Sequence, residues 1–514
     1  MANEENTKKQ TPLTKVVVER LKTESTLFRD QKSEPHIAVN HNGTKVLHIR
    51  SQEFKEWLRG WAMSNYDEEP MKDRQIDDIA NTLSALAIHR GEEKRLDVRL
   101  HQPKDAEILV DMGEKAIHIT SDRWIIVDDY APCFRRYKHQ RPLVEPKRYG
   151  NIEDLRQFAN IKNRDDWFVF LVFTVSALIP NFPKPALMLV GDQGSGKTVV
   201  SKIWKKLVDP SLFESSALIR DPKELARVAS RHALLVFDNT SRITPSMSDD
   251  LCRLITHDSL AKRALYTDDE DIIYSSRCHI ALNGIDIAMS AADLLDRTLI
   301  IRVERITDDK RMTEVELNEA FERLAPSILG GMLDIVVKAL KIYPTVKLDW
   351  LPRMADFAKF GYAIGEAMDG YSGDEFMEAY KRVIERQVDE ALMASPVAQA
   401  AQYLVRDIPE WTGTASAFQH KFSFYQDYDL GEDVASLCHH KIMRPENVAL
   451  LGKELTRAKS TLKSLGIELY RYRENNERLI KLVNTKYKNK PSEETAKTED
   501  TGKSEELDFD DIPF

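Results

Sequence analysis

The sequence predicts an α/β fold centred on a mostly parallel β-sheet. An apolar segment, Ala186–Val190, is followed at once by a glycine-rich loop and by a helical pattern that starts at Lys197. Other short apolar segments with the length of buried strands return later in the chain, with helical patterns between them: Ala233–Phe237, His279–Leu282 and Leu299–Val303. Strands that alternate with helices in this way build a parallel sheet covered by helices.

Composition limits the class of protein. The chain has 514 residues, enough for roughly two to four domains. Its formal net charge is −9, so contacts with nucleic acid must come from local basic patches. The start, Met1–Gln10, is polar and charged, unlike a signal peptide, and the longest apolar run, Trp167–Pro180, is shorter than the ~18–20 residues of a membrane helix. We expect a buried core helix there and a cytoplasmic protein without membrane association.

The cysteines favour a reducing compartment. None of the four belongs to a Cys-x-x-Cys pair, which argues against a zinc ribbon; they are Cys133, Cys252, Cys278 and Cys438. Cys438 is followed by two histidines, but no matching pair of ligands stands elsewhere in the chain. We predict no structural metal.

The N-terminal region reads as a small α/β domain. His36–Asn40 and Lys45–Ile49 flank an Asn-Gly pair, a good hairpin signal. Helical patterns follow, and then short alternating segments that indicate a small sheet. The helices are expected at Ser51–Met63 and Arg74–His89, and the strands at Ile108–Met112, Ala116–Thr120 and Trp124–Asp128. No catalytic signature stands out in this region.

The glycine-rich loop matches the pattern G-x-x-x-x-G-K-[ST] in full and stands between a strand and a helix, as the motif requires. Glycines let backbone N–H groups wrap phosphates at the positive end of a helix. Lys197 would reach the β- and γ-phosphates, and the Thr198 hydroxyl would bind Mg²⁺. A chance glycine-rich turn is the alternative. The predicted ATP-binding residues are Gly191, Asp192, Gln193, Gly194, Ser195, Gly196, Lys197 and Thr198.

A second metal-binding group is expected at the end of a neighbouring strand. The run Ala233–Phe237 ends at Asp238, which fits a Walker B carboxylate. Asn239 follows where many ATPases place a glutamate, and an amide can orient water but cannot accept its proton. The base therefore stays open, with Asp249 and Asp250 as two candidates.

Two further polar residues fit catalytic roles. Asn283, at the end of the strand His279–Leu282, fits a sensor that holds the attacking water, or else it caps a plain strand end. Arg297 precedes the strand Leu299–Val303 and could reach the ATP of a neighbouring subunit as an arginine finger, a role worth ~10³–10⁵ in rate. A surface ion pair with Asp293 or Asp296 is the alternative for Arg297. Arg302 and Arg305 are weaker finger candidates.

This series of motifs resembles superfamily 3 AAA+ helicases of the primase-helicase type from phages, satellites and other mobile elements. The resemblance covers roughly residues 185–306, with the order and spacing of the motifs intact. It implies a hexamer that shares ATP across subunit interfaces and moves 3′ to 5′ on DNA, and it implies that Lys262 and Arg263 grip DNA in the pore. Asn239 departs from the acidic residue of many relatives, and the N-terminal region lacks a primase site, so we predict a helicase or ATPase without primase activity.

A basic module is predicted near the C-terminus. Leu455, Ala458, Leu462 and Leu465 recur at helical spacing up to Gly466, and two short strands follow, Ile467–Arg473 and Arg478–Val483. A helix followed by a basic hairpin has the sequence shape of a winged helix, a module that closes some helicases of this family. A solvated basic helix with a structural hairpin is the alternative. The candidate DNA contacts are Arg457, Lys459, Lys463, Arg471, Arg473 and Arg478.

The last residues have the composition of a disordered acidic tail. Residues 491–514 hold nine acids and two lysines, a local charge of −7. The end resembles the acidic tip of bacterial single-stranded-DNA-binding proteins, which implies docking to host replication and repair proteins; an acidic tail that only solubilises is the alternative. The docking residues would be Asp508, Phe509, Asp510, Asp511, Ile512, Pro513 and Phe514.

The predicted organisation and function follow. The segments are a disordered start at 1–12, an N-terminal α/β domain of unknown role at 13–148, an AAA+ P-loop ATPase domain at 149–330, a helical connector at 331–431, a winged-helix-like module at 432–484 and a disordered tail at 485–514. The expected function is an ATP- and Mg²⁺-dependent helicase that replicates a mobile element on single-stranded or forked DNA. The alternative is a non-motor ATP switch, such as an initiator or helicase loader.

Overall fold

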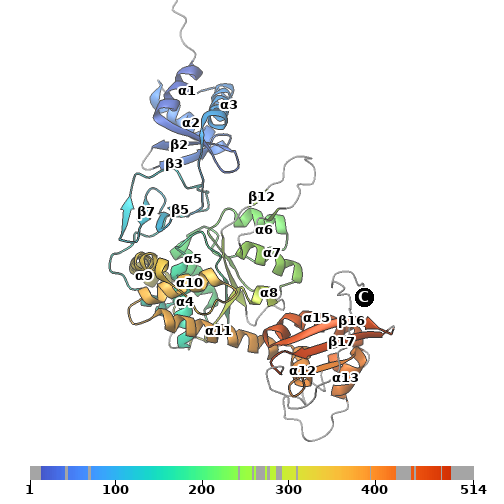
Figure 1. Cartoon of the computed structure of the whole chain (residues 1–514). Coiled ribbons are helices and arrows are strands. Elements are labelled where there is room, and N and C mark those ends of the chain that lie inside the picture. The colour runs from blue at the N-terminus through green and yellow to red at the C-terminus, as the bar shows by residue number, and fades with distance from the viewer. Residues whose placement is uncertain are drawn as a thin grey trace, which may run out of the picture. The chain divides into compact units, whose positions relative to one another are not determined.

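The computed structural model describes most of the chain (Figure 1). The chain divides into two compact units. The first is Met1–Thr240 with Arg253–Ile285 and Ile301–Ala379, and the second is Ser241–Cys252 with Asp286–Ile300 and Tyr380–Phe514. The described residues are 13–40, 44–66, 71–240, 243–256, 260–261, 273–274, 278–284, 292–307, 309, 311–393, 395–423, 441–444, 447–475 and 477–487. The predicted disordered start, the pore residues Lys262 and Arg263, Cys438 with its two histidines and the tail tip lie outside these residues.

The first unit begins with a four-stranded sheet and three helices. The strand order is β3-β2-β1-β4. Helix α2 starts after Ser51 because the Ser51 hydroxyl accepts a hydrogen bond from the Phe54 N–H, at 3.1 Å. The predicted hairpin and both predicted helices are present; α1 and β1 were not predicted. The elements are α1 (Leu13–Glu24), β1 (Ser25–Arg29), β2 (Pro35–Asn40), β3 (Thr44–His48), α2 (Gln52–Asn65), α3 (Asp73–Arg90) and β4 (Glu92–Glu93).

A second, antiparallel sheet follows. Its strands run in sequence order and include the three predicted segments: β5 (Leu100–Lys104), β6 (Glu107–Asp111), β7 (Ala116–Ile119) and β8 (Trp124–Val127). The buried carboxylate of Asp111 accepts a fork of hydrogen bonds from Arg136, whose guanidinium also donates to the Thr44 carbonyl of β3, at 3.1 Å. The predicted N-terminal domain therefore contains two sheets linked by the half-buried side chain of Arg136.

The central sheet carries the predicted nucleotide motifs. Its order is β10-β13-β9-β14, and β13 pairs in parallel with both β10 and β9. The segment Trp167–Pro180 contributes a buried helix, α4, as predicted. No helix among the described residues has the length and apolarity needed to cross a bilayer. The elements are η1 (Ile152–Gln157), α4 (Arg164–Ser176), β9 (Ala186–Val190), α5 (Lys197–Val208), α6 (Pro222–Ala229), β10 (Leu234–Phe237), α7 (Pro245–Ile255), β11 (Leu260–Ala261), β12 (Ile273–Tyr274), β13 (His279–Gly284), α8 (Ala292–Leu295) and β14 (Thr298–Arg302).

Long helices follow the sheet. The boundary predicted at 330/331 falls inside helix α9, which starts at Glu314 because Thr313 and Glu316 form a capping box. The apolar face of α9 packs against α10 and against η1. The helical region therefore starts before residue 331, where the connector was expected. The elements are α9 (Glu314–Ile342), η3 (Tyr343–Thr345), α10 (Ala355–Ala367) and α11 (Gly373–Met393).

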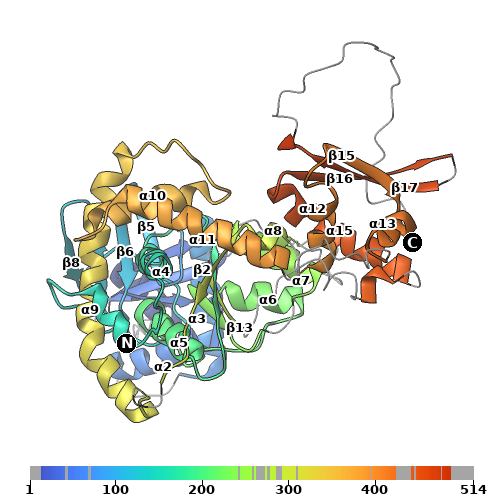
Figure 2. The same ribbon diagram turned by 90° about the horizontal axis from the view of Figure 1, so that it is seen from below.

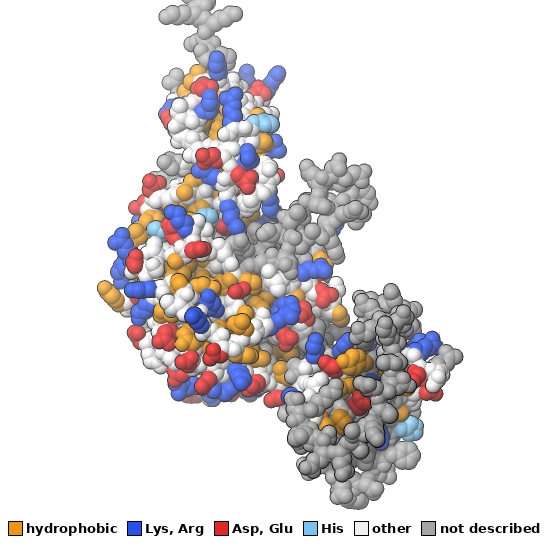
Figure 3. All heavy atoms as spheres, in the orientation of Figure 1, with side chains coloured by type: hydrophobic (Ala, Val, Ile, Leu, Met, Phe, Trp, Pro, Cys, Tyr) orange, Lys and Arg blue, Asp and Glu red, His pale blue; other side chains and the backbone are white. Residues whose placement is uncertain are grey.

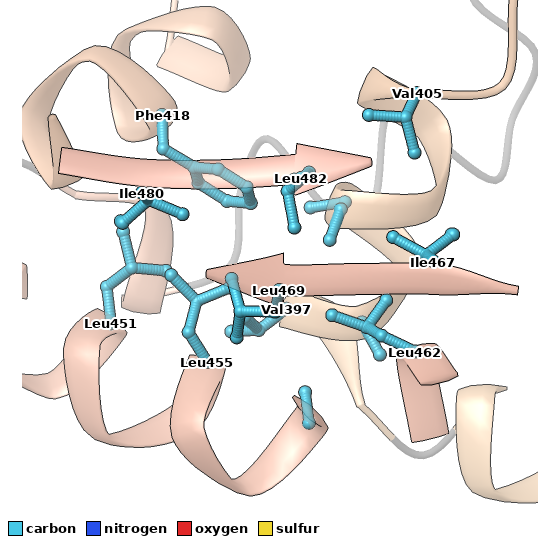
Figure 4. Packing of buried hydrophobic residues seen from close by; sticks show 14 of the residues in the cluster. Val397, Val405, Phe418, Leu451, Leu455, Leu462, Ile467, Leu469, Ile480 and Leu482 are labelled. Atoms are coloured by element: carbon cyan, nitrogen blue, oxygen red, sulfur yellow. The ribbon is translucent and has the colours of Figure 1, made fainter. Parts of the chain in front are cut away.

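The C-terminal elements of the second unit share one apolar core (Figure 4). Leu455, Ala458 and Leu462 are buried along α15, and Gly466 follows the helix with φ +82°, as the helical pattern predicted. The boundary predicted at 431/432 is wrong, because β15 is hydrogen-bonded to β17 and Phe418 lies in the same core. The elements are α12 (Pro396–Leu404), β15 (Glu410–Thr414), α13 (Ala415–Ser423), η4 (Lys441–Met443), α15 (Val448–Ser464), β16 (Ile467–Glu474) and β17 (Glu477–Asn484), with strand order β15-β17-β16.

Candidate nucleotide-binding site

The glycine-rich loop connects β9 directly to α5. Gly191, Gly194 and Gly196 have φ angles of +153°, +78° and +86°, a backbone region that side chains strongly disfavour. Gly191 also has no room for a side chain, since a Cβ there would lie 2.2 Å from the Val303 carbonyl oxygen. The loop therefore needs its glycines for backbone shape and for close packing against the residue that follows β14.

Lys197 is the first residue of α5. Its ammonium donates to the carbonyl oxygens of Gly191 and Asp192, at 2.6 and 2.8 Å, and lies 3.3 Å from the Ser195 hydroxyl. Partial burial lowers the pKa of Lys197, while the carboxylates of Asp192 and Asp238 act in the opposite direction. The lysine thus lies across the mouth of the loop, held by carbonyl groups that a phosphate could replace as partners.

Thr198 and Asp238 lie together although 40 residues separate them. The Thr198 hydroxyl is 3.0 and 3.2 Å from the two carboxylate oxygens of Asp238, which follows β10. Hard oxygen ligands of this kind, one hydroxyl and one carboxylate, suit Mg²⁺, which binds few protein groups and keeps several waters. The pair predicted from sequence is therefore formed, and its chemistry fits a magnesium ion shared with a triphosphate.

Asn283 joins this pair from the strand between β9 and β10. Its side-chain N–H₂ donates to Asp238 Oδ1, at 3.1 Å, and to the Ser201 hydroxyl, at 2.9 Å, and the residue is 1% exposed. Ser201 uses its own proton on the Thr198 carbonyl, so both neighbours accept and the amide orientation is determined. The Asn283 Oδ1 atom is buried and has no hydrogen-bond partner among the residues that the structure describes. An acceptor is thus held beside the carboxylate.

Asn239 adopts a left-handed backbone conformation immediately after Asp238. Its φ is +53°, a region that asparagine tolerates better than most residues, and its N–H donates to Asp238 Oδ1, at 3.0 Å. The side chain is exposed. Asn239 therefore helps to orient the carboxylate through its backbone. The two candidate bases lie on α7, where Asp249 is exposed and Asp250 is buried.

The segment that follows β14 runs along the glycine-rich loop, a contact that the sequence did not predict. Val303 donates its N–H to the Val190 carbonyl, at 2.9 Å, and Ile306 donates to the Gly194 carbonyl, at 3.4 Å. Asn160 holds this segment in place. Its backbone carbonyl accepts a hydrogen bond from the Glu304 N–H, at 2.9 Å, and its side-chain amide donates to the Glu304 and Arg305 carbonyls, at 3.0 and 3.1 Å. Side-chain polarity does not reveal these contacts, because most are made by backbone groups.

Arg297 is bound within its own unit. Its guanidinium forms an ion pair with the Asp293 carboxylate, donates to the Asp293 carbonyl at 2.8 Å and lies 3.9 Å from the Cys252 sulfur. The ion pair that was the alternative to the finger role is therefore present. It does not exclude the finger role, since a neighbouring subunit would have to compete with Asp293.

A buried charge cluster stabilises the far end of α5. Lys205 and Asp209 are 1% and 0% exposed, and Lys205 Nζ lies 2.7 Å from Asp209 Oδ2 and donates to the Leu234 carbonyl. Arg99 completes the cluster, 3.3 Å from Asp209 Oδ1. Burial alone would raise the pKa of Asp209, but the charges of Lys205 and Arg99 and the lysine hydrogen bond lower it well below its usual value. This cluster links α5 to β10, so it stabilises the two elements that carry Lys197 and Asp238.

The candidate DNA contacts of the C-terminal unit do not share one surface. Arg471 points toward the core side of the sheet, where it donates to the Gly452 carbonyl and where burial lowers its pKa. The predicted wing contact at Arg471 is therefore wrong, because its guanidinium is partly buried and bound to the Gly452 carbonyl of α15. Exposed candidates are Lys459, Lys463, Arg473 and Arg478, and the Arg457 side chain lies outside the described set. On the face of the chain that Figure 3 shows, basic and acidic side chains are mixed.

The sequence of the central region matches a known family. Residues 152–390 match the model of actinomycete integrative conjugative element replication proteins. These residues thus resemble a replication protein of a mobile element. The match covers the central sheet, α9, α10 and most of α11, so the nucleotide motifs lie inside the part that resembles such replication proteins.

Other comparisons add little. No curated protein matches the chain. An apo structure of the NrS-1 C-terminal region is 12% identical and covers 92% of this chain and 100% of that chain, with a TM-score of 0.41. Its A form is also 12% identical, covers 91% and 98%, and has a TM-score of 0.40. Likeness at this level carries no conclusion about function.

Proposed function

We propose that this protein is an AAA+ ATPase that drives DNA unwinding or translocation in the replication of a phage or other mobile element. The observation that carries the proposal is the meeting of Lys197, Thr198 and Asp238 at the end of one parallel sheet, with Asn283 beside them. The match of residues 152–390 to element replication proteins supports the biological setting.

The site would work by positioning and by charge. The loop N–H groups and Lys197 would bind the phosphates of ATP, and Thr198 and Asp238 would hold Mg²⁺, which neutralises charge on the transferred phosphoryl group. Phosphoryl transfer needs little covalent help from a protein, so preorganised partners of this kind supply most of the catalysis.

Asn283 would hold the attacking water. Its N–H₂ is occupied by Asp238 and Ser201, and its buried oxygen is the acceptor that remains. The proton of that water needs another acceptor, since the side chain of Asn239 is an exposed amide. We therefore expect slow hydrolysis unless a base is completed by bound nucleic acid or by a neighbouring subunit.

The motor would be a ring, with a hexamer as the expected form. Each ring interface would bring Arg297 of one subunit to the ATP of the next, while Lys262 and Arg263 would contact single-stranded DNA in the pore. The helix and hairpin of the C-terminal unit would serve as a winged-helix-like DNA contact, and the tail tip, Asp508–Phe514, would recruit host replication and repair proteins.

Substitution of Lys197 by alanine tests the ATPase proposal. We expect Lys197→Ala to abolish ATP turnover, because the Lys197 ammonium lies at the mouth of this loop, on the Gly191 and Asp192 carbonyls, where it would contact the phosphates. Lys202→Ala is the matched control, on the same helix but paired with Glu214. We also expect single-stranded DNA to stimulate the wild type. Equal turnover in Lys197→Ala and the control would refute the proposal, and an ATPase rate indifferent to DNA would count against the motor.

A non-motor ATP switch, such as an initiator or a helicase loader, is the second candidate. The observation that favours it is Asn239, since a weak hydrolase suits a switch whose bound nucleotide persists. A strand-displacement assay on a forked duplex separates the two. A motor displaces the strand with ATP and not with a non-hydrolysable analogue, whereas a switch binds the fork without displacing either strand.

A further inference from the structure

The chain between β14 and α9 is anchored at both ends to the elements of the nucleotide site. At its start, Ile306 donates its N–H to the Gly194 carbonyl of the glycine-rich loop, at 3.4 Å. At its end, Thr313 caps α9. The first turns of α9 lie along α5 (Figure 2), where Lys206 Nζ donates to the Asn318 side chain, at 3.1 Å. A side chain from this stretch can therefore reach the glycine-rich loop.

Arg311, two residues before the cap, lies against that loop. Its Nη2 atom is 3.5 Å from the position that a Cβ would take on Gly194. Because Gly194 has no side chain, the guanidinium lies directly beside the loop backbone. The residue is exposed. Arg311 belongs to none of the motifs in the sequence, so only the fold brings this arginine to the phosphate-binding loop.

The loop thus has two cations beside it. Lys197 Nζ lies on the carbonyls of Gly191 and Asp192, at 2.6 and 2.8 Å, and the Arg311 guanidinium lies beside Gly194. Two positive groups at one short loop repel each other until an anion lies between them. A guanidinium presents a planar fork of donors that matches phosphate oxygens, whereas an ammonium acts as a point charge. The arrangement suits a ligand with more than one phosphate group.

We propose that Arg311 contacts the phosphates of the nucleotide bound by its own chain, as a second cation beside Lys197. A change of rotamer can carry the guanidinium from the backbone of Gly194 to a phosphate held by the loop N–H groups. The inference rests on the proposed ATP site and adds a same-chain contact to it. Arg311 therefore differs from Arg297, which would act on the ATP of a neighbouring subunit.

Isothermal titration calorimetry of the full chain with Mg²⁺ and AMP-PNP, a non-hydrolysable ATP analogue, tests the proposal without turnover. We expect Arg311→Gln to weaken AMP-PNP binding about tenfold or more, the size of a lost charge-assisted hydrogen bond. Arg311→Lys keeps the charge but loses the fork, so its affinity should lie between those of Arg311→Gln and the wild type. Arg323→Gln, at an exposed arginine of α9, is the matched control and should bind like the wild type.

Inorganic triphosphate separates a phosphate contact from a contact with the nucleoside. If Arg311 touches only phosphates, Arg311→Gln should weaken inorganic triphosphate and AMP-PNP by the same factor. A variant that loses affinity for AMP-PNP alone would place Arg311 at the base or ribose, and the phosphate contact would be wrong.

Mixing variants tests whether the contact lies within one chain. Arg311→Gln mixed with Lys197→Ala should not regain ATPase activity, because every site then lacks one of its own two cations. Recovery would mean that Arg311 serves a neighbouring subunit, and it would overturn the same-chain contact.

The calorimetry also distinguishes this inference from the proposed function. If the wild type binds AMP-PNP and Lys197→Ala weakens it, while Arg311→Gln melts and binds like the wild type, the inference about Arg311 alone is overturned. If the wild type binds no AMP-PNP, both are overturned.

Discussion

The Asn283 side chain shows how one amide can be oriented by its surroundings. Asp238 cannot donate, and the Ser201 proton is already used on the Thr198 carbonyl, so the amide N–H₂ must face both of them. Its oxygen is then left buried without a partner in the described part of the chain, a costly arrangement that a bound water would relieve.

Replacing Asn283 tests this role. We expect Asn283→Ala to bind ATP within a few-fold of wild type and to lower turnover by about 10²-fold, because the substitution removes the group that positions water and leaves Lys197 and Thr198 in place. Ser201→Ala is the control, since it removes one partner of the amide and keeps the contact with Asp238. Steady-state ATPase assays and equilibrium nucleotide binding provide the measurements. A loss of binding that matches the loss of turnover would argue for a purely structural asparagine.

Histidines buried next to strands make the stability of the first unit depend on pH. Burial lowers the pKa of His36, on β2, to about 4, although its bond to the Glu34 carbonyl and the charge of Asp30 oppose this. Burial and then the charge of Lys205 lower the pKa of His232, just before β10, to about 3. An unfolded chain binds a proton at these histidines near pH 6.5, so the folded state binds fewer protons than the unfolded state below that pH.

The sign of the effect follows directly. The stability from each neutral histidine is fully present above pH 6.5 and is lost as pH falls toward its folded pKa, by up to ~1.4 kcal/mol per pH unit. We expect denaturant melts to show this loss between pH 7 and about 5. His36→Phe, which can keep the stacking on Phe28, should flatten the slope, and His89→Phe, at an exposed helical position, should not. Equal slopes in all three proteins would contradict this account.

The proposed role of Arg297 concerns the contact between neighbouring subunits, and mixing two variants tests it. In one chain this arginine is paired with Asp293, so an arginine finger would form only when a neighbouring ATP competes for it. We expect Lys197→Ala and Arg297→Ala to be inactive separately and to regain ATPase activity when mixed, since roughly a quarter of random interfaces would then hold an intact pair. The ATPase rate of the mixture, with its size by sedimentation, is the measurement. A mixture as inactive as its components would mean that Arg297 does not act across subunits.

The proposed docking role of Asp508–Phe514 is tested by truncation. We expect deletion of Asp508–Phe514 to leave the ATPase rate unchanged and to abolish pull-down of host replication proteins, because the terminal aromatic side chain and carboxylate would be the anchor. A variant with Phe514→Ala keeps the acidic residues and separates docking from charge. If both variants recover host proteins as well as the wild type does, the tip is only a solubilising segment.

The sequence alone determined the features that depend on local pattern. The strand Ala186–Val190, the loop with its three glycines and the start of a helix at Lys197 follow from adjacent residues, because the shape of a phosphate-binding loop is set by its own backbone freedom. The helix α15 and its end at Gly466 were predicted for the same reason, from apolar spacing and a residue that tolerates positive φ.

Only the tertiary structure decided which distant segments meet. The strand carrying Asn283 lies between those that lead to Lys197 and Asp238, the segment at Val303 packs onto Gly191, and β15 joins the C-terminal sheet across the predicted boundary. The faces of β16 were also settled by packing, which turned Arg471 inward and left Tyr472 exposed. Pairing between strands depends on how whole apolar faces are buried, so periodicity along one segment cannot reveal its partner.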